Sequence, residues 1–82
     1  MFQDKGGTTS TQDADTFLRG CIAYNGGTGY ASLHYPTSAY GALLAFQPYS
    51  NRVVQFYIEG SGSLWTRVMW GGTWGAWKLI GN

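Results

Sequence analysis

In the last third of the chain, hydrophobic residues recur at every second position, which is typical of β-strands. The runs Arg52 to Glu59 and Ser63 to Trp70 are rich in β-branched and aromatic residues. Gly60-Ser61-Gly62 separates these two runs, and Gly71-Gly72 separates the second run from a shorter final one. Short glycine-containing loops are typical of β-hairpins. The sequence therefore predicts a three-stranded antiparallel meander that ends near Ile80.

Loop length fixes the register of a hairpin, and the register predicts which residues share a face of the sheet. The first loop pairs Tyr57 with Trp65, Gln55 with Arg67 and Val53 with Met69, whereas the second pairs Met69 with Trp74, Arg67 with Ala76 and Trp65 with Lys78. One face, here called the apolar face, then carries Val54, Phe56, Ile58, Leu64, Thr66, Val68, Trp77 and Leu79. We expect the apolar face to form the hydrophobic core.

The opposite face, here called the mixed face, combines aromatic rings, cations and an amide. It carries Val53, Gln55, Tyr57, Trp65, Arg67, Met69, Trp74, Ala76, Lys78 and Ile80. Arginine and aromatic residues are enriched where two proteins meet, and flat rings beside polar groups also suit the binding of a sugar. We expect Gln55, Tyr57, Trp65, Arg67, Trp74 and Lys78 to form a trimer interface, with a glycan site as the alternative.

The rest of the chain predicts short strands and irregular segments. Residues 1–12 are rich in Gly, Ser and Thr and are interpreted as a flexible linker or the end of an upstream fibre segment, and residues 13–82 as one β-domain. Asp13 to Thr16 has the composition of one capped helical turn. A strand is expected over Phe17 to Tyr24 with a bulge at Gly20, and another over Ala42 to Gln47. The sequence predicts a small all-β domain, an antiparallel sheet or sandwich with at most one short helical turn.

Residues Tyr30 to Tyr40 contain three tyrosines and a proline, so we expect an irregular excursion and not a central strand. Loops on a β-scaffold are frequent sites of recognition. The candidate receptor-binding residues are Tyr30, His34, Tyr35 and Tyr40.

Composition narrows the classes of function. A net charge of +1 with 11% charged residues does not favour binding to nucleic acid. No run approaches the length of a membrane helix, and no His, Cys or Asp cluster has metal-site spacing, so we expect neither membrane insertion nor a metal. The single Cys21 is expected to be a small buried hydrophobe.

The chain also lacks the usual material of an active site. Three of its four carboxylates lie in or beside the predicted linker, which leaves Glu59 alone in the meander. Paired carboxylates for glycoside hydrolysis cannot be assembled from one protomer, and no GxSxG, P-loop or HExxH motif occurs. We expect no enzymatic activity, no catalytic residues and no cofactor.

Four segments together resemble the knob domain at the tip of pyocin and bacteriophage tail fibres. They are Ala42-Leu43-Leu44, Val53-Val54-Gln55-Phe56-Tyr57, Leu64-Trp65-Thr66-Arg67 and Gly72-Thr73-Trp74-Gly75-Ala76-Trp77-Lys78. The GTWxxWK ending is the most specific of these. The resemblance extends over roughly Asp15 to Ile80, and it departs from the family at Tyr35-Pro36, where the family often has Asn-Pro.

The resemblance implies a homotrimeric domain at the tip of a tail fibre or tail spike, in a virion or a phage-tail-like bacteriocin. Such a domain acts outside the cell and attaches to polysaccharide or lipopolysaccharide on the bacterial surface. The alternative is a structural module that trimerises or caps the fibre and has no ligand of its own.

Overall fold

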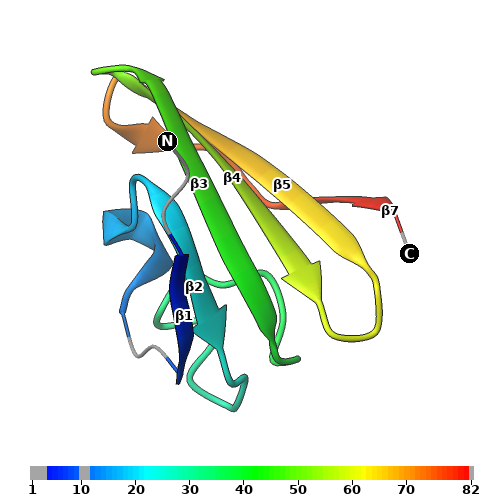
Figure 1. Cartoon of the computed structure of the whole chain (residues 1–82). Coiled ribbons are helices and arrows are strands. Elements are labelled where there is room, and N and C mark those ends of the chain that lie inside the picture. The colour runs from blue at the N-terminus through cyan, green and yellow to red at the C-terminus, as the bar shows by residue number, and fades with distance from the viewer. Residues whose placement is uncertain (1–3, 10–11, 82) are drawn as a thin grey trace.

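The computed structural model describes residues 4–9 and 12–81 and shows one twisted seven-stranded sheet (Figure 1). The strands are β1 (Asp4–Thr9), β2 (Gly20–Tyr24), β3 (Gly41–Tyr49), β4 (Arg52–Glu59), β5 (Leu64–Trp70), β6 (Thr73–Trp74) and β7 (Lys78–Gly81). They are ordered β1-β2-β3-β4-β5-β6, and β7 also pairs with β5. All pairs are antiparallel except β1 with β2. The predicted all-β class is confirmed.

One short helical turn, the 3-10 helix η1 (Ala14–Thr16), precedes β2. Asp13 caps η1, because its side chain accepts a hydrogen bond from the Asp15 backbone N–H at 2.9 Å. Among the described residues there is no helix of the length and apolarity that would cross a bilayer. The prediction of at most one helical turn is therefore confirmed.

The predicted register of the first hairpin is confirmed. Tyr57 lies opposite Trp65, and Gln55 lies opposite Arg67. In the loop between β4 and β5, Gly62 has a φ of 105°. That left-handed conformation is one that glycine adopts without a steric penalty, so the three-residue loop can close.

The register of the final strand differs from the prediction by one residue. Met69 pairs with Trp74 as expected, but Lys78 lies opposite Thr66 and not opposite Trp65. The cause is a break after β6, where the Gly75 N–H bonds to the Val68 carbonyl and the chain leaves the strand until Lys78. A one-residue shift moves every following side chain to the other face.

The prediction that the apolar face forms the core is wrong, because the two faces of the sheet are exchanged. The core consists of Ala14, Phe17, Ile22, Tyr24, Tyr35, Leu43, Ala45, Val53 and Tyr57. Gln55 and Arg67, from the mixed face, are buried with them. We call this side the inner face. Segment 12–19 and the excursion between β2 and β3 cover it, and Figure 1 shows that excursion passing behind β3 and β4.

The opposite side, here called the outer face, carries Leu44, Phe46, Val54, Phe56, Ile58, Leu64, Thr66 and Val68. Ile58 and Val68 are exposed, and Val54 and Phe56 are half-buried. Trp77 does not belong to this face, because it follows the break after β6 and packs against the inner core.

The segment predicted to be a linker contains a strand. Asp4–Thr9 forms β1, which runs parallel to β2 at the edge of the sheet, with Asp4 opposite Cys21. Backbone hydrogen bonds, which need no apolar side chains, hold an edge strand in place, so its composition gave no sign of it. Positions 1–3 and 10–11 of the predicted linker lie outside the described residues.

Candidate functional site

A polar network occupies the centre of the inner face. Gln55 Nε2 donates hydrogen bonds to the carbonyl oxygens of Ala14 at 2.7 Å and Phe17 at 2.8 Å. Its Oε1 accepts one from Arg67 Nε at 2.7 Å. Neither carbonyl lies in a strand; that of Ala14 also accepts from the Phe17 N–H within η1. A carbonyl left unpaired in a core would be costly. Gln55 therefore fastens segment 12–19 onto the sheet.

Arg67 carries a charge into this core and meets a carboxylate there. Its Nη2 lies 2.9 Å from Asp15 Oδ1. Burial lowers the pKa of the Arg67 guanidinium, and the adjacent Asp15 carboxylate acts in the opposite direction. An arginine remains protonated at neutral pH despite such a shift. The mixed face could be buried because its cation is paired.

Two tryptophan rings complete the surroundings of Arg67. Its Cζ lies 4.0 Å from the ring centroid of Trp74 and 4.7 Å from that of Trp77. The Trp77 Nε1 donates to the His34 carbonyl at 2.8 Å, and the Trp74 Nε1 to the Asp15 carbonyl at 3.3 Å. The tryptophans of the GTWxxWK ending thus hold backbone segments that come from elsewhere in the chain. Their geometry indicates a structural role.

Asp13, Asp15 and His34 form a charged cluster at the edge of this network. His34 Nδ1 lies 2.7 Å from Asp13 Oδ1 and 3.4 Å from Asp15 Oδ2. Burial acts to raise the pKa of Asp13, but the backbone N–H of Asp15 and the His34 ring lower it by more, and the net shift is downward.

The ligand atoms of this cluster lie within 4.8 Å of one another, which is compatible with a metal site. We assign no ion to it, since Asp13 pairs with His34 and Asp15 with Arg67. Two carboxylates already face an imidazole and a guanidinium. The cluster joins the capped turn η1 to the excursion between β2 and β3.

The structure separates the four candidate receptor residues of that excursion. Tyr35 is buried and stacks on Tyr24 with ring centroids 3.9 Å apart, so its ring cannot contact a receptor. Tyr30 is half-buried against the core. His34 is exposed but tied to Asp13. Tyr40 alone among the four combines high exposure, 64%, with a place at the end of the sheet. The excursion is irregular, as predicted.

Tyr40 lies over the hairpin loop that joins β4 to β5. A Cβ on Gly60 would fall 2.2 Å from the nearest atom of the Tyr40 ring, so a larger residue there would displace the ring. The Gly60 N–H also donates to the Tyr40 carbonyl at 2.8 Å. Tyr40 is therefore presented on a fixed surface at the end of the molecule where β3 begins.

Of the six residues expected at a trimer interface, three are buried within the protomer. Gln55, Tyr57 and Arg67 are at most 6% exposed and offer no surface to a second subunit. Trp65 and Trp74 are half-buried against the core, and Lys78 is exposed near the end of the chain. For the buried three, the expectation of an interface or a glycan site is wrong, because the chain covers this face itself.

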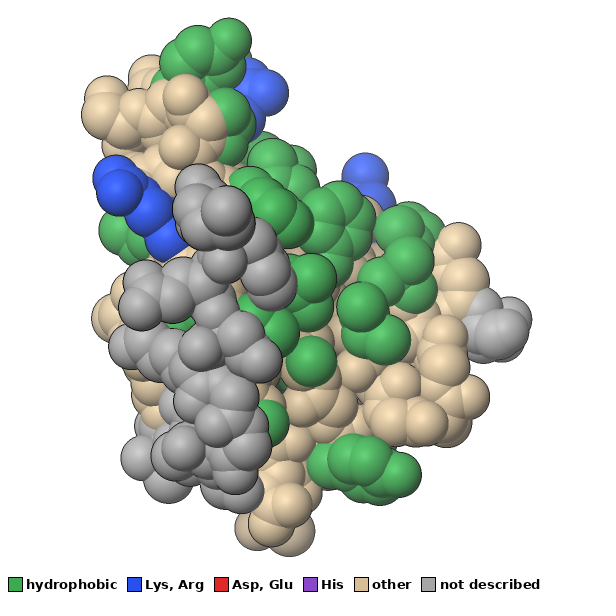
Figure 2. All heavy atoms as spheres, viewed as in Figure 1, with side chains coloured by type: hydrophobic (Ala, Val, Ile, Leu, Met, Phe, Trp, Pro, Cys, Tyr) green, Lys and Arg blue, Asp and Glu red, His purple; other side chains and the backbone are tan. Residues whose placement is uncertain are grey.

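Among the described residues, the outer face keeps several exposed hydrophobic side chains. In Figure 2, hydrophobic side chains gather over β3, β4 and β5, with Lys and Arg side chains at the margins and no acidic side chain in view among the described residues. Phe46 is 43% exposed and Ile58 is 42% exposed. Exposed apolar patches are common on surfaces where proteins associate or bind a ligand.

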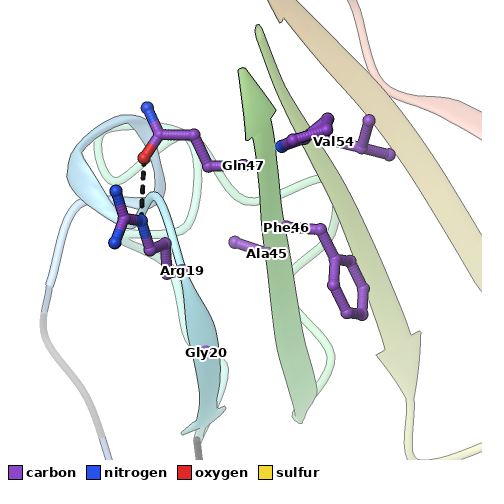
Figure 3. A pocket seen from close by; sticks show the side chains of 7 residues that line it. Arg19, Gly20, Ala45, Phe46, Gln47 and Val54 are labelled. Atoms are coloured by element: carbon purple, nitrogen blue, oxygen red, sulfur yellow. Dashed lines mark hydrogen bonds between the residues drawn. The ribbon is translucent and has the colours of Figure 1, made fainter. Parts of the chain in front are cut away.

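A hollow of about 620 Å³ opens on the same side, where β2 and β3 begin to diverge (Figure 3). Phe46 and Val54 lie to one side of β3, and Arg19 and Gln47 lie to the other. The Arg19 Nε donates to Gln47 Oε1 at 2.9 Å, which closes the polar end of the hollow. The hollow has a mixed polar and apolar lining, and it adjoins the outer face at Phe46 and Val54.

Sequence reasoning missed a second exposed aromatic group at the far end of β3. Tyr49, Arg52 and Trp70 lie side by side there, and Arg52 rests on the Trp70 ring. The signal was present, because the predicted hairpin already places Arg52 opposite Trp70.

The fold matches that of part of a pyocin fibre. A structure of the Pseudomonas aeruginosa R1 pyocin fibre comprising C-terminal residues 323-701 is similar with a TM-score of 0.74 and 20% sequence identity, over 96% of this chain and 24% of that chain. This confirms, at the level of the fold, the resemblance to pyocin fibres. The chain spans about a quarter of the length of the pyocin structure. No protein-family model and no curated protein matches the chain.

Proposed function

We propose that this chain is the homotrimeric tip domain of a tail fibre, which attaches a phage or a phage-tail-like particle to polysaccharide or lipopolysaccharide on the bacterial surface. The observation that carries the proposal is the fold it shares with the pyocin fibre, combined with the exposed hydrophobic side chains of the outer face. We assign it no catalytic role. It acts extracellularly, at the tip of the particle.

The outer face supplies the subunit interface. A domain of 82 residues buries only about 60–65% of its unfolded surface, so burying further apolar area by association would contribute much of its stability. The residues by which the outer face is defined include no charged side chain that would have to be desolvated, and Arg52 lies at the end of the same side. Three copies with this face toward a common axis would cover it and leave the excursion between β2 and β3 outside.

Sedimentation equilibrium tests the interface. Ile58→Lys places a charge within the outer face, and Ser61→Lys places the same charge in the exposed β4–β5 loop as a matched control. We expect the parent and Ser61→Lys to sediment as trimers and Ile58→Lys as a monomer. A parent chain that is monomeric at all accessible concentrations would contradict the trimer, and a trimeric Ile58→Lys would move the interface elsewhere.

Receptor attachment is assigned to the exposed part of the excursion, where Tyr40 is the residue most open to a ligand. A glycan array of bacterial surface polysaccharides, probed with the isolated chain, tests attachment. We expect Tyr40→Ala to reduce the signal about ten-fold, which is the order of magnitude of one lost aromatic contact, with the melting temperature unchanged. An array without any bound glycan, together with no adsorption to bacterial cells, would contradict attachment.

The second candidate function is a structural module that trimerises or caps the fibre without a ligand. The exposed hydrophobic side chains of the outer face favour this function, since association of subunits alone would explain why they are there. Binding to cells separates the two functions. If the domain is purely structural, deleting it would disperse or aggregate the fibre, and the isolated trimer would bind to no cell surface.

A further inference from the structure

Three neighbouring residues form a compact group at the end of the sheet opposite Tyr40, which we call the aromatic corner: Tyr49, Arg52 and Trp70. Tyr49 pairs with Arg52 across β3 and β4, and Arg52 pairs with Trp70 across β4 and β5. The rings of Tyr49 and Trp70 are 68% and 60% exposed, more than the centre of the outer face. In Figure 2, hydrophobic side chains stand beside a Lys or Arg side chain at this upper end.

Arg52 is held flat on the indole of Trp70, with its Cζ 3.4 Å from the ring centroid. Its Nε is buried and bonds to none of the described residues. Among those residues, no carboxylate pairs with its guanidinium, whereas the buried Arg67 is paired with Asp15. Arginine forms its strongest interactions with planar carboxylates and with phosphates. The aromatic corner thus presents an oriented cation that lacks an anion.

The backbone beneath the aromatic corner is fixed. The Gly71 N–H donates to the Asn51 carbonyl at 2.8 Å and ties the β5–β6 turn to the β3–β4 turn. Gln47 Nε2 donates to the Ser50 carbonyl at 3.3 Å and braces the second of these turns. Gly71 and Gly72 both have positive φ, the conformation that a tight hairpin turn requires. A ligand would therefore meet a preformed surface, which lowers the entropic cost of binding.

We propose that the aromatic corner binds an acidic sugar unit, a uronic acid or a sugar phosphate, in a bacterial surface glycan. This deepens the proposed attachment function and rests on it. The pyranose C–H face stacks on Trp70 or Tyr49, whose flat rings carry a negative quadrupole face. The carboxylate or phosphate of the same sugar pairs with the Arg52 guanidinium beside the ring. Binding of one acidic sugar thus needs one ring face and one cation, and the aromatic corner has both.

A single-stranded nucleic acid also combines stacking with phosphates, but the charge of the chain argues against it. Nucleic-acid grooves contain several cations that follow successive phosphates, because each neutralised phosphate contributes to affinity. The chain has five lysines and arginines in total and a net charge of +1. One of the five, Arg67, is buried. The single open cation of the aromatic corner suits one acidic sugar.

The aromatic corner is separate from the receptor surface at Tyr40. Tyr40 precedes β3 and Tyr49 ends it, and the nine residues of β3 correspond to about 30 Å of extended strand. Substitutions at one end are therefore expected to leave the other end intact. This separation lets the two binding assignments be tested independently.

The test is a titration of the intact chain with an oligomer of galacturonic acid, followed through the indole N–H resonances. The neutral methyl ester of the same oligomer, inorganic phosphate and a single-stranded oligonucleotide are compared as probes. Arg52→Gln removes the cation, and Trp70→Leu removes the flat ring from an exposed strand position. Lys78→Gln changes the net charge by the same amount as Arg52→Gln, from a site outside the aromatic corner, and is the matched control.

We expect the acidic oligomer to shift the Trp70 resonance. Arg52→Gln and Trp70→Leu should each weaken binding about five- to ten-fold, and Lys78→Gln should not change it. The methyl ester should bind as weakly to the parent as the acid binds to Arg52→Gln. Equal losses in Arg52→Gln and Lys78→Gln would overturn the proposal, since binding would then follow net charge. If phosphate or the oligonucleotide binds as tightly as the acidic oligomer, the assignment to a sugar is overturned.

Two further measurements separate this proposal from those on which it rests. If the parent adsorbs to bacterial cells but does not bind the acidic oligomer, the aromatic corner is refuted and attachment stands. If the oligomer binds but no cell or glycan preparation does, attachment is refuted and the acidic-sugar site stands. Dissociation of the trimer by Arg52→Gln, seen in sedimentation, would overturn the proposal by placing the corner in the subunit interface.

Discussion

Arg67 and Arg52 each lie against tryptophan on the same sheet, Arg67 on its inner face and Arg52 on its outer face. Arg67 is buried between Trp74 and Trp77, and Asp15 neutralises its charge. Arg52 rests on the exposed Trp70 and has no acidic partner among the described residues. The same stacking contact thus serves two environments. The difference shows that a paired carboxylate, more than the rings, decides which arginine enters the core.

The two faces as a whole repeat this difference. The inner face buries an amide whose hydrogen bonds go to Ala14, Phe17 and Arg67, and a guanidinium whose charge is paired with the Asp15 carboxylate. The outer face exposes aliphatic and aromatic side chains, although these could be buried without leaving a polar group unpaired. Burial in this protomer therefore follows from which face receives the covering segments. The face that looks more hydrophobic is left available to another chain.

The largest expected effect comes from removing the buried cation. Arg67→Met keeps a similar volume and leaves the Asp15 carboxylate and the Gln55 amide oxygen without their donor. Breaking a buried ion pair in this way costs about 3 to 5 kcal/mol. We expect the free energy of unfolding to fall by that amount in urea denaturation at a fixed protein concentration.

Arg52→Met is the matched control on the outer face, since it removes an equal charge from a tryptophan contact without a carboxylate partner among the described residues. Losing an exposed cation–π contact costs about 0.5 to 1 kcal/mol. If the two variants unfold at the same urea concentration, the distinction between the paired and the unpaired arginine is wrong.

The next effect concerns aliphatic residues. Leu43 is fully buried in the inner core, and Leu43→Ala should cost about 2 to 5 kcal/mol at every protein concentration. Ile58→Ala, on the outer face, should instead make the melting temperature depend on concentration more steeply, because it weakens association. Calorimetry over a hundred-fold range of concentration, roughly, separates the two behaviours. A concentration-independent loss at Ile58 would show that the outer face is covered within one protomer.

The sequence predicted the strands well because loop length and two-residue periodicity are local signals. Gly60-Ser61-Gly62 fixed the pairing of Gln55 with Arg67, and the structure shows that pairing. The choice of core face was wrong because it depends on segment 12–19 and the excursion between β2 and β3, whose positions no local pattern reveals. One available sign was an arginine among tryptophans on the sheet, together with Asp13 and Asp15 earlier in the chain.

The candidate site was predicted less well than the fold. Tyr35 was grouped with Tyr40 because both lie in one irregular segment, yet Tyr35 stacks on Tyr24 inside the core and Tyr40 faces solvent. A tyrosine serves equally as a core ring and as a contact for a ligand, so residue type cannot separate the two roles. Exposure depends on tertiary packing.

A smaller effect is expected where the inner face meets the excursion. Tyr57 is buried, and its hydroxyl donates to the Ala39 carbonyl at 2.6 Å. Burial, together with Tyr35 and Tyr24 nearby, raises the pKa of this phenol, so it remains a donor at neutral pH. Tyr57→Phe leaves that carbonyl without its donor and should cost about 1 to 1.5 kcal/mol.

Amide hydrogen exchange shows which part of the chain Tyr57→Phe destabilises. Amides between residues 25 and 40 should exchange faster in Tyr57→Phe, and those of β4 and β5 should change little. Thr66→Val is a comparison variant, because the Thr66 hydroxyl also donates to a backbone carbonyl, that of Gln55, but from the outer face. Faster exchange in the excursion of Thr66→Val would show that the effect is not specific to the inner face.

The smallest effect is a pH dependence at the cluster that joins η1 to the excursion. The pKa of Asp13 is lowered in the folded protein, so the folded state binds a proton less readily than the unfolded state. Its stabilising contribution is present above the ordinary aspartate pKa of 3.8 and is lost as the pH falls through the lower, folded value. Asp13→Asn retains a side chain that caps a helix about as well, so at neutral pH it should cost less than about 1 kcal/mol. Below pH 4 the parent and Asp13→Asn should converge in melting temperature, with the parent falling more steeply as the solution is acidified. Parallel melting curves from about pH 6 to pH 2 would show that the Asp13 carboxylate does not stabilise the covering of the inner face.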